Sequence, residues 1–436
     1  MIDFAWAAIA FGDVALIALA FALGFVAKLI GLPPLVGFLA TGFLLNAYGV
    51  AEGELLQKMA DLGITLLLFT VGLKLNLGTL GRPQVWAVTA IHMTLVVAVL
   101  TPLVLGLAAV GLVYFADLDW RSAALVAFAL SFSSTVFAVK VLEERSETRS
   151  LHGRIAVGIL IMQDIVAVVF LVLSSGDVPS PWALLLFLLI PLRRALYFVL
   201  DQVGHGELLV LYGFLLALGG AELFTLVGMK GDLGALVLGV MVAHHGKAEE
   251  MAKTMLGFKD LFLLGFFLSV GLSGALSWET LAIGALLTPL IALKAVALFG
   301  LLTGFNLRSR TALLATVNLT NFSEFGLIVA AFGVANGWLD GIWLTVLAIA
   351  LSLSFAAAAV LNMAAHPLYA RHRPFWRRFQ RGRRLPDDTV LDLKGCTVAI
   401  IGMGGVGTGA YDTMRGRHGE TVVGVDIDPV TVRNQQ

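Results

Sequence analysis

Three ionisable residues, Asp164, Lys294 and Glu324, lie near the middle of long apolar stretches of the sequence. A charged group at the centre of a membrane span costs about 2.5–3.5 kcal/mol, and groups of this kind usually have a function. A carboxylate surrounded by apolar residues can hold either a proton or a monovalent cation, because both remove its isolated charge. We therefore expect Asp164, with its neighbour Gln163, to form an ion site. Lys294 is the candidate partner of Asp164 in a buried ion pair, and it can also occupy the carboxylate until a cation displaces it.

Two polar runs interrupt otherwise apolar segments, one at residues 131–135 and the other at 318–324. Hydroxyl groups that bond back to their own helix would explain a single run. Two runs, seven predicted helices apart, favour discontinuous helices whose freed backbone groups need side chains, water or an ion. We assign Ser134 and Thr135 to the ion site and Asn321 to its support, together with Lys294. Glu324 is expected to support the site as a partner of the backbone or of a lysine.

A glycine-rich loop lies near the end of the sequence. The apolar run 397–401 predicts a short strand, and it is followed by the pattern G-x-G-x-x-G, with glycines at Gly402, Gly404 and Gly407. A second predicted strand, 421–425, ends at Asp426, where an acid would reach the ribose of a bound nucleotide. The sequence stops shortly afterwards, so we expect a truncated chain that holds only the start of a Rossmann-like α/β domain.

The composition indicates which elements position these residues. Of 436 residues, 59% are hydrophobic and 13% are charged, against about 45–50% and about 25% in soluble domains. This composition excludes a soluble enzyme and a nucleic-acid-binding protein, and the single cysteine, Cys396, excludes an internal disulfide framework. We predict an all-α polytopic membrane protein in the lipid bilayer, with no enzymatic activity and no nucleic-acid partner.

Apolar segments of about 20 residues are long enough to span a bilayer. They predict about thirteen transmembrane helices, of which the seventh is the weakest because Arg193 and Arg194 interrupt it. The ranges are 5–29, 33–49, 59–77, 84–113, 120–141, 152–174, 181–200, 206–227, 232–245, 257–275, 278–305, 310–334 and 338–364.

Three regions follow from this pattern: a transmembrane domain at 1–365, a basic and then acidic cytoplasmic linker at 366–394, and the domain fragment at 395–436. Lys and Arg favour cytoplasmic loops. Their distribution places the N-terminus outside and the C-terminus in the cytoplasm.

A faint internal repeat relates predicted helices 2 and 3 to helices 9 and 10. Because the copies are seven helices apart, they have opposite orientations in the membrane, as in secondary transporters that bind their substrate on broken helices at the midplane. The matching residues are Asp61, Gly72 and Leu73 with Asp260, Gly271 and Leu272, and Gly37, Gly42 and Gly49 with Gly234, Gly239 and Gly246.

With these motifs, the sequence resembles the bacterial Kef-type potassium:proton antiporters of the cation:proton antiporter-2 family. The motifs that carry the resemblance, in order, are Leu66 to Phe69 with Gly72 and Leu73, Ser133-Ser134-Thr135, Leu142-Glu143-Glu144-Arg145, Gln163-Asp164, Phe266-Phe267 with Gly271, Lys294, and Ser323-Glu324-Phe325.

The resemblance implies that Asp164 binds the ion and the proton. Gln163 would be the neutral neighbour at a position where related sodium exchangers often have a second acid, and a single acid implies electroneutral exchange. The resemblance also implies a homodimer in the bacterial inner membrane and an elevator-like movement of the ion site. It further implies a regulatory domain for an adenine nucleotide (AMP or NAD(H)) and an ancillary regulatory subunit.

These features predict a potassium:proton antiporter that works by alternating access at Asp164. The loop tied to glutathione control reads His-Ala-Leu-Glu in the family, but residues 244–250 read H-H-G-K-A-E-E here. Glutathione control is therefore not part of the prediction. A sodium:proton antiporter of the same fold stays open, because the sequence does not separate the two cations. A nucleotide-gated potassium channel is a third alternative, and the sequence lacks a selectivity-filter motif that would favour it.

Overall fold

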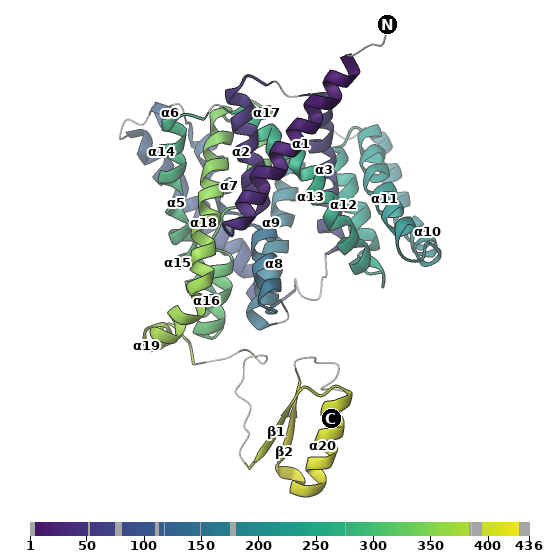
Figure 1. Ribbon diagram of the computed structural model, residues 1–436, viewed down its shortest axis with the longest axis vertical. Helices are drawn as coiled ribbons and strands as arrows, with labels where there is room; N and C mark the ends of the chain where they lie inside the picture. Colours follow the sequence, from purple (N-terminus) through teal and green to yellow (C-terminus); the bar gives the residue numbers. More distant parts are fainter. Residues whose placement is uncertain are drawn as a thin grey trace.

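The computed structural model describes residues 5–50, 53–74, 81–109, 113–116, 118–148, 150–174, 180–274, 276–382, 385 and 395–426. Most of these residues form helices that lie side by side in one bundle, and a small unit of two strands and a helix lies beyond one end of it (Figure 1). The acidic part of the predicted linker lies outside the described residues.

Eight helices among the described residues are long and apolar enough to cross a membrane. They are α3 (Glu54–Leu73), α5 (Pro83–Ala109), the pair α7 (Trp120–Ser131) and α8 (Thr135–Glu144), α9 (Leu151–Ser174), α11 (Glu207–Leu226), α13 (Ala248–Ser273), the pair α14 (Trp278–Leu287) and α15 (Leu290–Gly304), and α18 (Ile342–Arg371).

The other helices are α1 (Ala5–Leu29, described in full only from its middle), α2 (Pro34–Ala47), α6 (Val113–Ala116), α10 (Leu189–Gln202), α12 (Gly231–Val242), α16 (Ser309–Asn318), α17 (Glu324–Ala335) and α19 (Arg373–Arg377). Each predicted range overlaps one helix or a pair of consecutive helices. The number of thirteen crossings stays a prediction.

The seventh predicted range, 181–200, overlaps a 3-10 helix, Pro181–Leu188, followed by α10. Arg193 and Arg194 of α10 are exposed, and Arg193 donates to the Tyr197 hydroxyl at 2.7 Å. The predicted linker begins too early, because α18 continues to Arg371. The last turns of α18 contact the loop before α9, where His366 Nε2 lies 3.0 Å from a Glu147 carboxylate oxygen.

One group of helices contains both copies of the repeat: α1, α2 and α3 pack with α11, α12 and α13. A Cβ atom added to Gly42 of α2 would lie 2.7 Å from the Gly271 Cα of α13. A Cβ added to Gly72 of α3 would lie 3.0 Å from the Gly239 Cα of α12. Because Gly42 corresponds to Gly239 and Gly72 to Gly271, these are two copies of one contact. The absence of side chains allows the backbones to approach this closely, and the pairing supports the inverted repeat.

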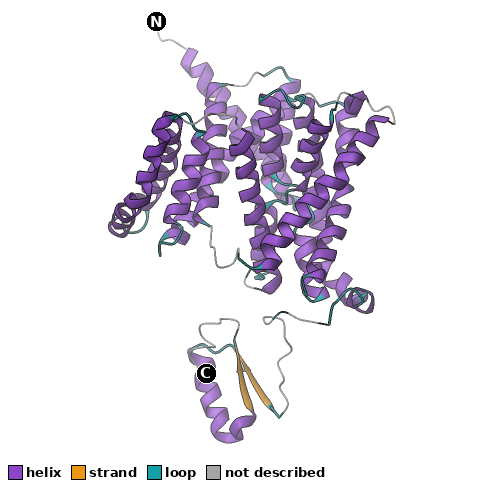
Figure 2. Ribbon diagram, turned by 180° about the vertical axis from the view of Figure 1, so that it is seen from behind, coloured by secondary structure: helices purple, strands orange, loops and turns teal. Residues whose placement is uncertain are grey.

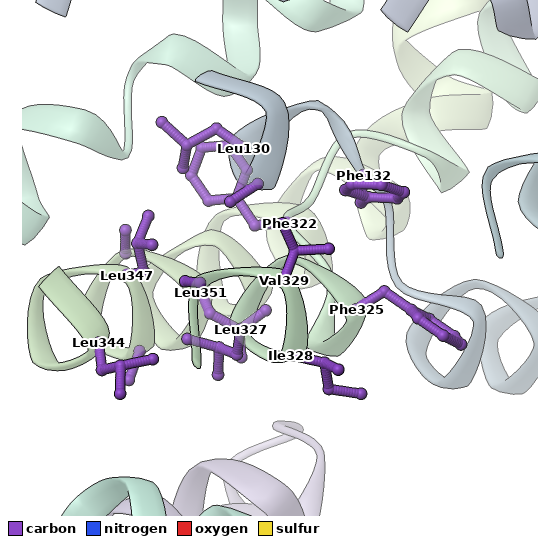
Figure 3. Packing of buried hydrophobic residues seen from close by; sticks show 14 of the residues in the cluster. Leu130, Phe132, Phe322, Phe325, Leu327, Ile328, Val329, Leu344, Leu347 and Leu351 are labelled. Carbon is purple, nitrogen blue, oxygen red and sulfur yellow. The ribbon is translucent and has the colours of Figure 1, made fainter. Parts of the chain in front are cut away.

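The remaining helices, α5, α7 to α9 and α14 to α18, form a second group, which contributes most residues of a large apolar cluster. Phe132 at the end of α7 and Phe322 before α17 belong to this cluster, as do Leu130, Val329 and Leu347 (Figure 3). The connections between broken helices are therefore in the interior of the bundle and not at its surface.

The C-terminal unit consists of β1 (Val398–Ile401), α20 (Gly405–His418) and β2 (Val422–Val425) (Figure 2). The strands are parallel, and Val398 pairs with Val422 and Ile401 with Val425. A parallel pair needs a crossover connection, which α20 provides. The unit is thus a β-α-β arrangement, and its assignment to a Rossmann-like domain stays a prediction.

Candidate ion site at two helix breaks

The two polar runs are the places where helices break. The chain leaves the helical path between α7 and α8 at residues 132–134, and again between α16 and α17 at residues 319–323. Ser134 begins α8 as its N-cap, because its hydroxyl accepts a hydrogen bond from the Phe137 N–H at 3.2 Å. Ser323 caps α17 in the same way through the Phe325 N–H. Ser is among the preferred N-cap residues, so the polar runs both end one helix and start the next.

Side chains from neighbouring segments satisfy the backbone groups that the breaks set free. The Ser133 N–H donates to Gln163 Oε1 at 2.9 Å, and the Ser134 N–H donates to Asn321 Oδ1 at 2.6 Å. The Phe322 N–H donates to Ser354 Oγ of α18 at 3.0 Å. All of these partners are buried, so leaving any one unbonded would cost about 1–3 kcal/mol. The sequence analysis did not identify Ser354 as a partner of the break, although a serine inside a long apolar helix could have indicated it.

The Lys294 ammonium group joins the two breaks. Its Nζ donates to the Phe132 carbonyl at 2.6 Å and to the Asn321 carbonyl at 2.9 Å, with a longer contact to Ser133 Oγ at 3.4 Å. Only 2% of the residue is exposed. Both carbonyls follow the C-terminal ends of helices, where a positive charge is favourable.

These contacts bear on the ion pair that the sequence suggested between Lys294 and Asp164. Among the described residues, Lys294 makes its hydrogen bonds to these oxygen atoms and forms no ion pair with Asp164. In this structure Lys294 therefore connects the two helix breaks through hydrogen bonds.

Asp164 lies next to the first break. It is 3% exposed, and its Oδ2 accepts a hydrogen bond from the Thr135 hydroxyl at 3.2 Å. Within the described residues, its Oδ1 has no hydrogen-bond partner. The structure thus brings Asp164, Gln163, Ser134 and Thr135 together. An ionised carboxylate with an unbonded oxygen in this environment is costly, and either a proton or a cation would relieve that cost.

Glu324 is a second buried carboxylate, and among the described residues no hydrogen bond joins it to Asp164. It is 1% exposed, and Oε2 accepts a long hydrogen bond from the Ser323 hydroxyl at 3.4 Å, whereas Oε1 has no partner among the described residues. The expected contact with a lysine is not formed, since Lys294 contacts the breaks instead. Glu324 lines a cavity of about 280 Å³ with Asp260, Phe38 and Val136. It therefore faces the boundary between the two groups of helices.

The glycine loop of the C-terminal unit makes a tight turn between β1 and α20. Gly402 has a φ of +89°, which favours glycine, and a Cβ at Gly407 would collide with the Gly402 carbonyl oxygen. Gly404 is the N-cap of α20, and Asp426 Oδ2 accepts a hydrogen bond from the Met403 N–H at 2.5 Å. The four predicted residues therefore meet at one end of the β-α-β unit, at a helix N-terminus where phosphates bind readily.

Residues 15–363 match the family model described as sodium/hydrogen exchanger, transmembrane. Over 353 residues the chain is 31% identical to the putative cation/proton antiporter YbaL of Escherichia coli K12, which covers 73% of this chain and 61% of that protein. Over 364 residues it is 30% identical to the glutathione-regulated potassium-efflux system protein KefC of Klebsiella pneumoniae, and the match covers 77% of this chain and 57% of that protein. The chain thus spans about three fifths of the length of these curated relatives.

Among solved structures, the sodium proton antiporter MjNhaP1 of Methanocaldococcus jannaschii is similar, with a TM-score of 0.56 over 83% of this chain and 99% of that one. At 14% sequence identity this likeness shows a shared fold and nothing finer.

Proposed function

Because the chain belongs to the sodium/hydrogen exchanger family, in which its relatives are cation/proton antiporters, we propose that it exchanges potassium ions for protons across the bacterial inner membrane. The predicted resemblance to Kef-type antiporters is confirmed by these relatives. The observation that supports the exchange reaction best is the buried Asp164 carboxylate, which has one unbonded oxygen and no contact with Lys294.

The proposed reaction is a competition for this carboxylate. A proton and a cation cannot both occupy it, so the arrival of one releases the other. The Thr135 hydroxyl donates to the Asp164 carboxyl group in the structure, and after rotation its lone pairs could face a bound cation instead. Gln163 adds no charge, and its amide oxygen is already engaged by Ser133. A single acid in the Gln163-Asp164 pair supports one proton per cation, and hence electroneutral exchange.

Potassium is the first candidate cation because the KefC relative is described as a potassium-efflux protein. Sodium is the second, favoured by the description of the matching family model. Both cations suit the same site, since each is a monovalent ion that oxygen atoms coordinate.

Proton flux in proteoliposomes that contain a pH-sensitive dye tests the proposal. We expect flux when potassium is added, and we expect Asp164→Asn to abolish it while the protein stays folded. Glu222→Gln, which changes an exposed carboxylate of α11, is the matched control and should retain full flux. Flux that survives in Asp164→Asn would refute the ion site. Sodium-dependent flux of the same size or larger would support the same mechanism with sodium as the substrate. Potassium flux that does not depend on the pH gradient would indicate a channel.

We further propose that the group with the glycine contacts, α1 to α3 and α11 to α13, is the static part of a homodimer, and that the second group carries the ion site in an elevator-like movement. The glycine loop would hold the phosphates of a regulatory adenine nucleotide at the N-terminus of α20, with Asp426 near the ribose. Binding of AMP or NADH, measured by calorimetry on a chain with the complete C-terminal domain, tests the second part.

A further inference from the structure

A basic cavity of about 720 Å³ lies at the end of the bundle where α16 begins and α18 ends. Four arginines from two segments line it, and His366, Tyr369 and Gln380 complete its wall. The arginines are Arg308 and Arg310 at the start of α16, and Arg373 and Arg377 on α19. This cavity is separate from the ion site, since it shares no lining residue with the two helix breaks.

Three of the four cavity arginines have no carboxylate partner in the part of the chain that the structure describes. There, Arg310, Arg373 and Arg377 form no ion pair with an acidic side chain. The nearby Glu147 is already engaged, because it accepts from His366 at 3.0 Å and from His152 at 3.2 Å. The N-terminal end of α16 adds further positive potential to the same place. Guanidinium groups converging on a cavity are typical of sites for phosphate oxygens, which they can bind through two parallel hydrogen bonds.

Aromatic side chains place this cavity at the level of a membrane surface. Phe375 and Phe379 of the α19 region are each 49% exposed, and Trp376 packs with its ring centroid 5.3 Å from that of Phe299 on α15. Aromatic residues gather at the boundary between hydrocarbon and water. Arginines in the same short segment would then lie at the depth of lipid phosphates, and basic pockets of this kind on the cytoplasmic side bind anionic headgroups.

We propose that this cavity binds a phosphate group, supplied either by the headgroup of an anionic phospholipid or by a soluble phosphate anion. The arginines of α16 and α19 bind the same phosphate group. Binding of this group therefore couples the start of a broken helix to the end of α18. The site does not depend on which cation the protein transports.

The test uses the purified chain in a neutral detergent, with phosphatidylglycerol, phosphatidylcholine and inorganic phosphate as separate probes, and thermal unfolding as the readout. We expect phosphatidylglycerol or phosphate to raise the Tm in a saturable way, whereas phosphatidylcholine does not. In Arg310→Gln/Arg373→Gln the half-saturating concentration should rise roughly tenfold or more, because two bidentate contacts are lost. The matched control Arg193→Gln/Arg194→Gln removes two exposed arginines from α10 and should behave as the wild type.

The two arms identify the source of the phosphate. A response to phosphatidylglycerol alone indicates a lipid headgroup, and a response to inorganic phosphate at similar concentrations indicates a soluble anion. If neither probe raises the Tm, or if the cavity variant responds as the control does, the proposal is wrong. The exposed single variant Arg377→Gln, which should weaken the response several-fold, provides the same comparison if the double variant does not fold.

Discussion

Replacing Lys294 by methionine tests the conclusion that this lysine holds the two helix breaks together. The change keeps an unbranched side chain, one atom shorter, but removes the donors to the Phe132 and Asn321 carbonyls at 2.6 and 2.9 Å. Each buried carbonyl left without a partner costs about 1–3 kcal/mol. Part of this loss is recovered, because the variant no longer buries an ammonium group, whose transfer from water costs several kcal/mol. We expect a net destabilisation of about 2–4 kcal/mol.

In thermal unfolding of the detergent-solubilised protein this loss corresponds to a Tm lower by roughly 4–8 °C. Lys140→Met is the matched control, because Lys140 is 45% exposed and its nearest carboxylate oxygen, on Glu144, is 3.9 Å away; it should change the Tm by less than about 1 °C. The Lys294→Met protein should still exchange ions, at a reduced rate. A Tm equal to that of the wild type would refute the structural role. Complete loss of exchange with an unchanged Tm would place Lys294 in the transport reaction instead.

Three further changes test other parts of the structure. Gly271→Val should lower the Tm by several degrees and reduce the yield of folded protein, because its Cβ would lie 2.6 Å from the Leu39 carbonyl oxygen. Gly246→Ala is the control and should leave the Tm unchanged, because a Cβ at this position meets no atom within 4 Å. Asn321→Ala should cost about 1–3 kcal/mol, because the Ser134 N–H loses its acceptor at 2.6 Å; an unchanged Tm would show that the break does not need this bond. Asp119→Ala should lower the Tm at pH 7 but progressively less below pH ~4. Two hydrogen bonds from Ser122 lower the pKa of the Asp119 carboxyl in the folded protein. The stability that this carboxylate contributes is therefore present above its unfolded pKa and is lost as the pH falls through the lower folded pKa. A difference between the two proteins that grows on acidification would contradict that sign.

The helix breaks could be predicted from the sequence because their signal is local. Serine, threonine and asparagine side chains stand out in an apolar segment, and the chain breaks where they occur. The partner of Lys294 could not be predicted in this way. Asp164 was the nearest candidate by charge, whereas the ammonium group binds backbone carbonyls, which every residue carries and which the sequence does not distinguish.

The basic cavity could not be predicted for a different reason. Its arginines were interpreted as part of a polar linker and of the loop before α16, because a charged stretch after the last apolar helix is usually solvated. The structure shows that α18 continues past His366 and that α19 folds back, with Trp376 against Phe299. Only this return of the chain places Arg373 and Arg377 opposite Arg308 and Arg310.

The paired glycine contacts have a consequence for how the protein is made. Gly42 and Gly271 are more than two hundred residues apart, so α2 enters the membrane long before its partner helix exists. At a synthesis rate of about 5–20 residues per second, the interval is roughly 10–45 s. During that time the bare glycine strip on α2 is open to lipid or to a wrong helix. The inserted N-terminal half therefore stays without its partner helix during this interval. A membrane chaperone or insertase would have to shield α2 for that whole time.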